Sequence, residues 1–417
     1  MYSLRRLGEL MKEKRLLVLG AGEAQLQIIE AALKQGIYTI VCDKRDYMKG
    51  TRIADKYYCV DYMDREAILR VAEDEKVDGV VSNSEPAMIN VAWLSEQLHL
   101  PGNKERSVET LLSKTAFREL QESVGVFAPK HCIVSDESVL QDAINLIGYP
   151  LVIKPVLSSG TRGTTIIKSD NYELATQAYR QCADFSRDHI VSIEQYVPMS
   201  ELVAYDAELF VHGNDILWDG LYASFRTDDA PMLPMMESLP LDLEEDKIYK
   251  IKEAISKLIY ASGVVLGEFN AESYFTPEGD VFVIEINPRQ GGNHIPDLVL
   301  EHAGVDFTSL LCTTAVGDNK AFEDAKNQNR KNKYVTMHVV FSMNEGQYQG
   351  LTFSETIKPY VVWHENVINE GESVSRKKNA GDAVAFVMLS FPTQEKQREL
   401  TREISMHIKP IVMHVGG

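Results

Sequence analysis

The chain has 417 residues, of which 44% are hydrophobic and 25% are charged, and this composition excludes a collagen-like, low-complexity or wholly disordered protein. Its formal net charge of −18 repels nucleic-acid phosphates and anionic membranes, so neither is an expected partner. The charged amino terminus does not read as a signal peptide, the five cysteines form no Cys-x-x-Cys pair, and no window is apolar over the roughly 20 residues of a membrane span, which together predict a reduced, cytoplasmic protein.

The first predicted unit, residues 1–103, alternates short apolar runs with amphipathic stretches. Residues 16–19 and 38–41 read as strands, and the segment between them, up to Gln35, reads as a helix. This βαβ order predicts a parallel sheet, and the alternation continues to the Pro101-Gly102 turn. We therefore expect one small α/β unit.

Two glycines, Gly20 and Gly22, lie between this first strand and helix, where a dinucleotide-binding fingerprint would lie. Gln25 stands where the fingerprint has its third glycine, so the helix and the strand cannot approach as closely. A turn that only packs, or that touches a substrate, is favoured. An NAD- or FAD-dependent oxidoreductase stays as an alternative.

The second predicted unit, residues 104–200, has a loop rich in Ser and Gly between two strands, residues 151–153 and 164–168. Small residues let backbone N–H groups approach phosphate oxygens, and Lys154, at the end of the first strand, would add a positive charge. The loop has no Gly-Lys-Ser/Thr and is not a P-loop. An ordinary hairpin turn is the alternative interpretation.

The third predicted unit, residues 201–317, combines an amphipathic helix with a β-hairpin. Asp242 and Glu245 have capping-box-like spacing before the helix, and Gly263 is a stop signal after it. In the hairpin, we expect Thr276 to lie opposite Val281. Counting outward from that pair places Glu272 opposite Glu285, on adjacent strands.

The second strand of the hairpin places Val283, Glu285 and Asn287 on one face, because side chains alternate along a strand. Like charges directly opposite each other, as expected for Glu272 and Glu285, are destabilising. A divalent cation such as Mg²⁺, which prefers oxygen ligands, would offset the repulsion. A protonated carboxyl group, or a register that slips by one residue, would offset it as well.

Arg289 follows the hairpin and would extend just beyond the same face, where its guanidinium matches phosphate or carboxylate. The next residues, 290–294, form a glycine turn that allows close approach to a ligand. Residues 317–333 are polar and charged and are the best linker candidate. Beyond them, strand-like and helix-like runs alternate to the end of the chain.

The order of these features resembles the ATP-grasp superfamily, in its carboxylate-amine-ligase type. The order comprises Lys114, Lys154 with its Ser/Gly loop, residues 194–197, Glu272, and the run Glu-Ile-Asn-Pro-Arg at 285–289. The likeness covers about residues 15–315, and that last run with its upstream Glu is the most specific part.

The resemblance implies an α/β fold with four parts. These are a Rossmann-like domain that precedes the ATP-grasp fold (1–103), a small lid domain (104–200), a central domain that binds Mg²⁺ and ATP (201–317), and a small α/β carboxyl-terminal extension (318–417). The implied cofactors are ATP and Mg²⁺, or Mn²⁺ in its place.

The resemblance also implies roles for single residues. Lys114 and Lys154 would contact the ATP phosphates, beneath a mobile flap that includes Ser158, Ser159, Gly160 and Gly163. Glu194 would accept from the adenine amino group, backbone groups of Gln195 and Val197 would read the adenine edge, and Glu201 would hold the ribose. Glu272, Glu285 and Asn287 would bind the metal, and Arg289 would steady the transferred phosphoryl group.

The implied substrates are a small carboxylate and an amine, with an amino acid favoured. Candidate substrate contacts are Glu85, Arg226, Gly291, Gly292 and His294. Homodimers are frequent in this family, so a homodimer is also an expectation. A carboxylase-type enzyme of the purine-biosynthetic or biotin-carboxylase kind, and a non-catalytic ATP-binding sensor, are the alternatives.

Overall fold

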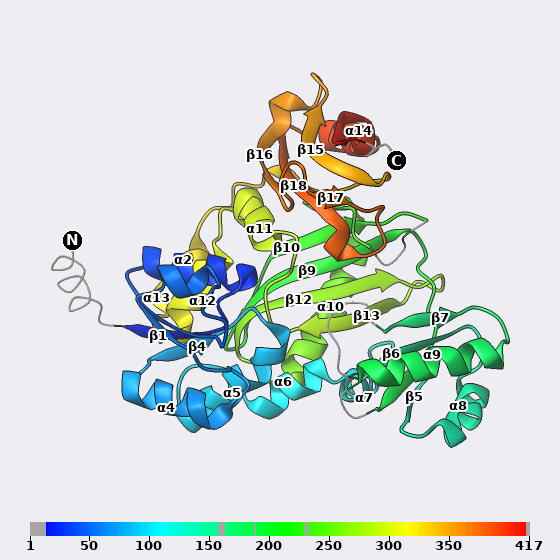
Figure 1. The fold of residues 1–417 in the computed structure, drawn as a ribbon, viewed down its shortest axis with the longest axis horizontal. Helices are drawn as coiled ribbons and strands as arrows, with labels where there is room; N and C mark the ends of the chain where they lie inside the picture. Colours follow the sequence, from blue (N-terminus) through cyan, green and yellow to red (C-terminus); the bar gives the residue numbers. More distant parts are fainter. Residues whose placement is uncertain (1–13, 157–162, 187–188, 229, 231–232, 414–417) are drawn as a thin grey trace.

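The computed structural model describes residues 14–156, 163–186, 189–228, 230 and 233–413, which fold as a mixed α/β protein with four sheets (Figure 1). Across these residues, none of the helices combines the length and the apolar character needed to cross a membrane.

The amino-terminal unit is a four-stranded parallel sheet in the order β3-β2-β1-β4. This confirms the α/β unit expected there. Its elements are β1 (Arg15–Leu19), α2 (Glu23–Lys34), β2 (Tyr38–Cys42), α3 (Gly50–Ile53), β3 (Lys56–Tyr58), α4 (Arg65–Glu75), β4 (Gly79–Val81), η1 (Glu85–Ala87) and α5 (Met88–Gln97).

A second, antiparallel sheet in the order β5-β8-β6-β7 forms the small domain at the side of the molecule (Figure 1). Helices α8 and α9 share one apolar core with this sheet. The elements are α6 (Glu105–Leu112), α7 (Lys114–Ser123), β5 (His131–Val134), η2 (Glu137–Val139), α8 (Leu140–Ile147), β6 (Leu151–Pro155), β7 (Thr165–Ile167), α9 (Tyr172–Phe185) and β8 (Val191–Gln195).

The largest sheet has eight antiparallel strands in the order β13-β12-β9-β10-β11-β14-β18-β16. Helix α10 packs on one face, and α11, α12 and α13 cover part of the other. The central elements are β9 (Val203–His212), β10 (Asp215–Phe225), β11 (Met236–Leu239), α10 (Glu245–Ser262), β12 (Leu266–Phe275), β13 (Val281–Asn287), α11 (Ile295–Ala303), α12 (Phe307–Ala315) and α13 (Lys320–Asn327).

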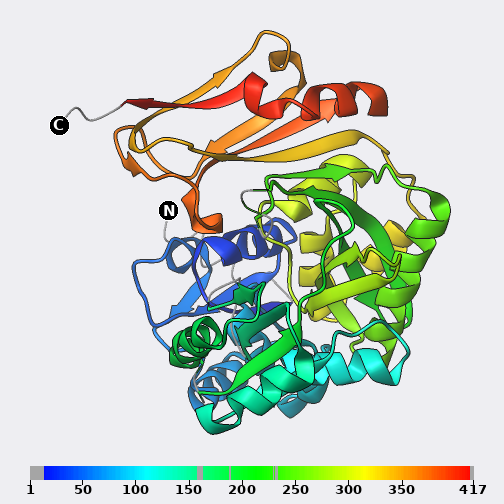
Figure 2. The same cartoon turned by 90° about the vertical axis from the view of Figure 1, so that its right-hand side faces the viewer.

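The carboxyl-terminal part adds strands to this same sheet, because β14 pairs with β11 and β18 pairs with β14. A three-stranded sheet, β17-β15-β19, lies beside it at the top of the molecule (Figure 2). The elements are β14 (Tyr334–Phe341), β15 (Gly346–Phe353), η3 (Lys358–Tyr360), β16 (Val361–Asn366), β17 (Ser373–Val374), η4 (Ala380–Asp382), β18 (Ala383–Phe391), α14 (Gln394–Thr401), α15 (Ile404–His407) and β19 (Ile408–Met413).

Two local expectations for the central part are wrong. The capping-box start of α10 does not form, because Glu244 is the N-cap without a side-chain cap and Asp242 pairs with Arg398. The polar stretch 317–333 is not a free linker, since it contains α13, whose Phe322 is fully buried against the large sheet. The predicted stop at Gly263 is confirmed, with φ at +76°. The four-domain division stays a prediction, although the large sheet continues across its boundary at 318.

Helix α12 connects the amino-terminal unit to the large sheet, because Cys312, Ala315 and Val316 share a core with β1 and α2. A Cβ added to Gly79 on β4 would lie 2.2 Å from the carbonyl oxygen of Ala315. We expect Gly79→Ala to lower the free energy of unfolding by about 1 to 3 kcal/mol, as overpacking does. Denaturant unfolding measures this, and an unchanged midpoint would contradict the close approach.

Candidate active site

The hairpin formed by β12 and β13 places two glutamates face to face, because Glu272 pairs with Glu285 as expected. The route to that pairing differs from the expectation. Phe275, and not Thr276, lies opposite Val281, and a β-bulge then shifts the register between Glu272 and Ser273. The two single-residue shifts cancel, so the prediction for the carboxylates holds.

The bulge changes which neighbours the carboxylates have. Val283 lies in the apolar core beneath α10, on the opposite face from the one predicted. Bulges re-aim side chains in this way beside active sites. The face that carries Glu272 therefore presents Glu285 and Asn287, with the Asn287 amide donating to Glu285 Oε1 at 2.8 Å.

The electrostatics of this pair show the strain of two like charges. Burial, followed by the charge of Glu285, raises the pKa of Glu272 to about 8. In the described part of the chain, no group of three or more His, Cys, Asp or Glu could hold a metal ion. The donors present are two carboxylates and one amide, all oxygen ligands, and this set fits a hard divalent cation that keeps waters or phosphate oxygens.

Arg289 connects this face to the amino-terminal unit. Its Nη2 lies 3.1 Å from Glu85 Oε2, and its Nη1 donates to the Gln290 carbonyl at 2.9 Å. Glu85 and Lys114 line a hollow of about 310 Å³ together with Glu285 and Asn287. Burial raises the pKa of Glu85, while the Arg289 charge lowers it and Glu285 raises it further. Predicted site residues from three sequence regions thus meet in one hollow.

A second charged cluster lies in the small domain, where Lys154 Nζ is 2.7 Å from Glu194 Oε2 and Arg118 Nε is 3.3 Å from the same oxygen. All three side chains are at least nine-tenths buried. Burial lowers the pKa of Lys154 to about 8, although Glu194 opposes that shift. Lys154 and Arg118 hold the pKa of Glu194 at about 2, against the effect of burial. The cluster carries net positive charge, as a phosphate site requires.

The same sheet face that carries Glu272 holds further buried acids. Their pKa values are raised, with burial as the largest cause in each case. They are Asp206, Glu208, Glu237 and Glu268. Glu208 accepts from the backbone N–H of Gly291 at 2.9 and 3.0 Å.

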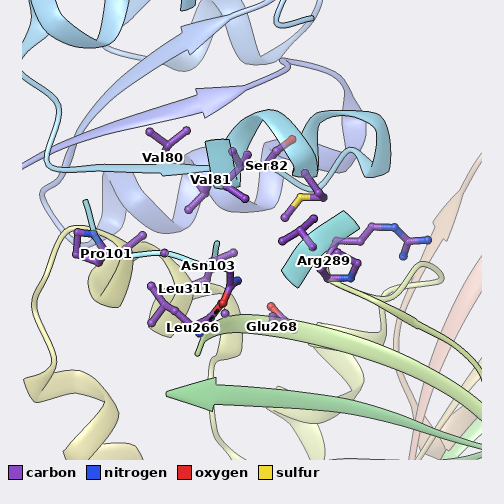
Figure 3. Close-up of a pocket in the computed structure, with 17 residues that line it drawn as sticks. Val80, Val81, Ser82, Pro101, Asn103, Leu266, Glu268, Arg289 and Leu311 are labelled. Atoms are coloured by element: carbon purple, nitrogen blue, oxygen red, sulfur yellow. Dashed lines mark hydrogen bonds between the residues drawn. The ribbon is translucent and has the colours of Figure 1, made fainter. Parts of the chain in front are cut away.

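A separate pocket of about 500 Å³ lies between the end of β4 and the start of β12 (Figure 3). Apolar side chains such as Val80, Val81 and Leu311 line it, and Glu268 and Arg289 lie at its polar side. The amino-terminal unit therefore covers one edge of the carboxylate face.

Residues 147–297 match the family model described as the ATP-grasp domain. The chain contains an ATP-grasp domain. Sequence relatives include two formate-dependent phosphoribosylglycinamide formyltransferases. That of Ignicoccus hospitalis is 24% identical over 66% of this chain and 69% of its own length, and that of Proteus mirabilis is 27% identical over 44% and 47%. The chain thus spans about half the length of the Proteus relative.

Solved structures share the fold over nearly the whole chain. The L-amino acid ligase from Bacillus licheniformis superposes with a TM-score of 0.80 at 18% identity, over 97% of this chain and all of that one. The phosphoribosylglycinamide synthetase from Anaerococcus prevotii superposes with a TM-score of 0.74 at 21% identity, over 96% of this chain and all of that one. At these identities the likeness establishes the fold.

Several predicted nucleotide contacts of the ATP-grasp domain stay predictions. Ser158, Ser159 and Gly160 lie outside the described residues. Gly163 has φ at +75°, which favours glycine at this end of the loop. Glu194 is the counter-ion of Lys154, so an adenine amino group would share an already engaged carboxylate. Glu201 is exposed, just before β9 begins.

The adenine-reading segment is partly engaged with its surroundings. The Gln195 N–H donates to the Lys130 carbonyl at 2.8 Å, and the Val197 carbonyl accepts from the Tyr274 hydroxyl at 2.7 Å. The backbone therefore holds this segment against β12 and β5. Its role in reading adenine stays a prediction.

In the glycine turn after Arg289, Gly291 lies against the protein's own carboxylate Glu208. A Cβ on Gly291 would lie 2.7 Å from Glu208 Oε2, whereas the space beside Gly292 is open. His294 binds Asp297 Oδ2 at 2.9 Å and packs against the rings of Trp363 and Phe386. These contacts join α11 to the carboxyl-terminal strands, and a substrate role for His294 stays a prediction.

Sequence reasoning missed Arg118 and the buried acids of the ATP-grasp domain. Arg118 is 1% exposed and also donates to the Ile284 carbonyl at 2.9 Å, so it joins α7 to β13. The signal in the sequence was the position of Arg118, which directly follows Phe117 on the apolar side of α7. Asp206 and Glu208 alternate with apolar residues on β9, a pattern that usually indicates a solvated face.

Proposed function

We propose that this protein is an ATP-dependent ligase that activates a carboxylate as an acyl phosphate and joins it to an amine, with an amino acid among its substrates. The observation that carries the proposal is the facing pair Glu272 and Glu285, half-buried beside Arg289 and Lys114. Phosphoryl transfer needs charge neutralisation and positioning more than a side-chain nucleophile. The charged side chains of this site support such a role.

In this proposal Lys114 and Lys154 bind the ATP phosphates. Glu272, Glu285 and Asn287 hold Mg²⁺ or Mn²⁺, which when bound neutralises charge on the phosphates. Arg289 donates to the transferred phosphoryl group, and Glu85 orients Arg289 through their ion pair. The fold and the family domain support these roles.

The chemistry proceeds in two transfers. A carboxylate oxygen attacks the γ-phosphorus, an O–P bond forms, and ADP leaves. The amine then attacks the acyl carbon, a C–N bond forms, and the C–O bond to phosphate breaks, so that phosphate leaves and the amine loses a proton. The products are ADP, phosphate and an amide.

A second candidate is a reaction on formate or another one-carbon acid, because the sequence relatives are named as formate-dependent formyltransferases. Both candidates share the acyl-phosphate step and differ in the carboxylate. Incubation with ATP, Mg²⁺ and pools of amino acids, small acids and formate distinguishes them by mass spectrometry. A condensed mass with equimolar ADP identifies the substrates, and tight binding of Mg-ATP without ADP release would indicate a sensor instead.

The Lys154 ammonium gives a pH-dependent expectation for ATP binding. With a pKa of about 8, Lys154 is charged below that pH and becomes neutral as pH rises through it. We expect kcat/KM for ATP to fall above about pH 8, and to fall less in Lys154→Arg, whose guanidinium stays charged. Steady-state kinetics from pH 6.5 to 9.5 measure this, and identical profiles for both proteins would contradict the role of Lys154.

A further inference from the structure

Two buried groups of opposite charge lie on the carboxylate face beyond the proposed metal ligands. Glu237 on β11 pairs with Ser224 on β10, and Arg226 follows two residues after Ser224. Arg226 lies directly after the end of β10, and its guanidinium approaches Asp206 on the carboxylate face. The Glu237 residue is 2% exposed and the Arg226 side chain is 7% exposed.

Each of these groups has a polar atom without a partner. Glu237 Oε1 accepts from the Asn293 amide at 2.9 Å, while Oε2 is buried with no hydrogen bond from the described residues. Arg226 Nε is likewise buried without one, and the ion-pair contact of its guanidinium among the described residues, Nη2 to Asp206 Oδ2, is long at 3.8 Å. Buried polar atoms are nearly always satisfied, so these two mark places where a bound water or ligand would form hydrogen bonds.

The two groups do not satisfy each other, although their charges interact. The charge of Arg226 acts on Glu237, yet the ion pairs of the described residues include none between them. An occupant that satisfies both must accept a hydrogen bond from Arg226 Nε and donate one to Glu237 Oε2. A guanidinium matches a carboxylate through its fork of donors, and a carboxylate matches an ammonium. An α-amino acid carries both groups on one carbon.

The position selects one of the two substrates of the proposed reaction. Asp206, which Arg226 approaches, accepts a hydrogen bond from the backbone N–H of Ser273 at 3.0 Å, and Ser273 directly follows Glu272, so this subsite adjoins the metal face. A carboxylate that receives the phosphoryl group must lie at Arg289 and the metal ligands, and it cannot also occupy Arg226. A carboxylate on Arg226 therefore belongs to the other substrate, the amine.

We propose that Arg226 and Glu237 form the subsite for the amine substrate and that this substrate is an α-amino acid, with its carboxylate on Arg226 and its ammonium on Glu237. This inference rests on the proposed ligase function. It assigns Glu237 as the residue that binds the amine, and it makes the predicted substrate contact Arg226 the residue that determines specificity.

The test compares acceptors after the first step has been measured separately. Hydroxylamine traps an acyl phosphate as a hydroxamate and needs neither Arg226 nor Glu237. The acceptors are the amino acid that yields product from the pool and the amine that lacks its carboxylate. Wild type should use the amino acid with a KM about 10- to 100-fold lower than the KM for the amine. This factor corresponds to the free energy of one hydrogen bond to a charged group.

Arg226→Gln should remove this preference by raising KM for the amino acid about 10- to 100-fold, with KM for the amine, KM for ATP and hydroxamate formation unchanged. Glu237→Gln should raise KM for both acceptors and leave hydroxamate formation unchanged. Arg226→Lys, which keeps the charge and loses the fork, should retain part of the preference. Asp219→Asn, a matched control on β10 whose carboxylate pairs with Arg330, should change none of these values.

The outcomes separate the two proposals. No hydroxamate from any carboxylate in wild type would overturn the ligase function itself. Hydroxamate without any amino-acid product would overturn only the subsite, as would an unchanged preference in folded Arg226→Gln or Arg226→Lys. A wild type that does not distinguish the amino acid from the amine would mean that only water satisfies the two atoms, and would also overturn it.

Discussion

Replacing Glu285 by Gln should abolish ADP formation while the fold stays intact. Loss of one metal carboxylate should lower kcat by roughly 1,000-fold or more, because metal-held charge stabilisation contributes several kcal/mol. The variant should fold normally, since Gln keeps an acceptor for the Asn287 amide and removes a like charge from Glu272. Unfolding without metal should therefore show equal or greater stability.

Coupled ADP assays, calorimetric titration with Mg²⁺ and denaturant unfolding measure the three quantities. Glu278→Gln is the matched control, because Glu278 is an exposed carboxylate in the turn of the same hairpin. Full activity in folded Glu285→Gln would rule out the proposed metal site, and with it the ligase mechanism.

Replacing Arg289 by Met should lower kcat by about 100-fold or more and change KM for ATP only a few-fold. The guanidinium is proposed to contact charge that develops on the transferred group, and donors of that kind are typically worth 100- to 1,000-fold in kcat. Arg289→Lys should recover little, since an ammonium cannot reproduce the fork. Rapid quench of acyl phosphate as the hydroxamate measures the step directly.

Glu85→Gln is the companion variant for Arg289. If Glu85 only orients the guanidinium through their 3.1 Å contact, its loss should lower kcat by a much smaller factor than loss of Arg289. Equal effects of the two single variants and of the double variant would indicate one coupled unit. An unchanged kcat in Arg289→Met would exclude its proposed role.

The hairpin of β12 and β13 shows how much of the strand pairing could be predicted from local sequence. Alternation and turn chemistry led to the facing pair Glu272 and Glu285, yet the predicted contact of Thr276 with Val281 was wrong by one residue. The β-bulge brought Glu272 back opposite Glu285, and no pattern in the sequence predicted the bulge. A bulge is set by how a strand bends over its neighbours, which in this sheet are α10 and β9.

For the acidic residues on β9 and β11, local pattern predicts the wrong environment. Alternating acids ordinarily indicate a solvated strand face, and local pattern offers no reason to suspect Asp206, Glu208 or Glu237. The structure buries all three, and the turn after Arg289 contacts Glu208 and Glu237. Whether a polar face meets water depends on segments 50 or more residues away.

The sequence by itself determined the elements whose causes are local: the strand and helix periods, the stop of α10 at Gly263, and the ordered motifs that mark the ATP-grasp domain. Only the tertiary structure decided that residues beyond 318 extend the central sheet, that Glu194 pairs with both Lys154 and Arg118, and that Glu85 meets Arg289. The physical reason is range. Backbone propensity and side-chain alternation act over a few residues, whereas burial and charge pairing depend on chain segments that meet only when the fold is complete.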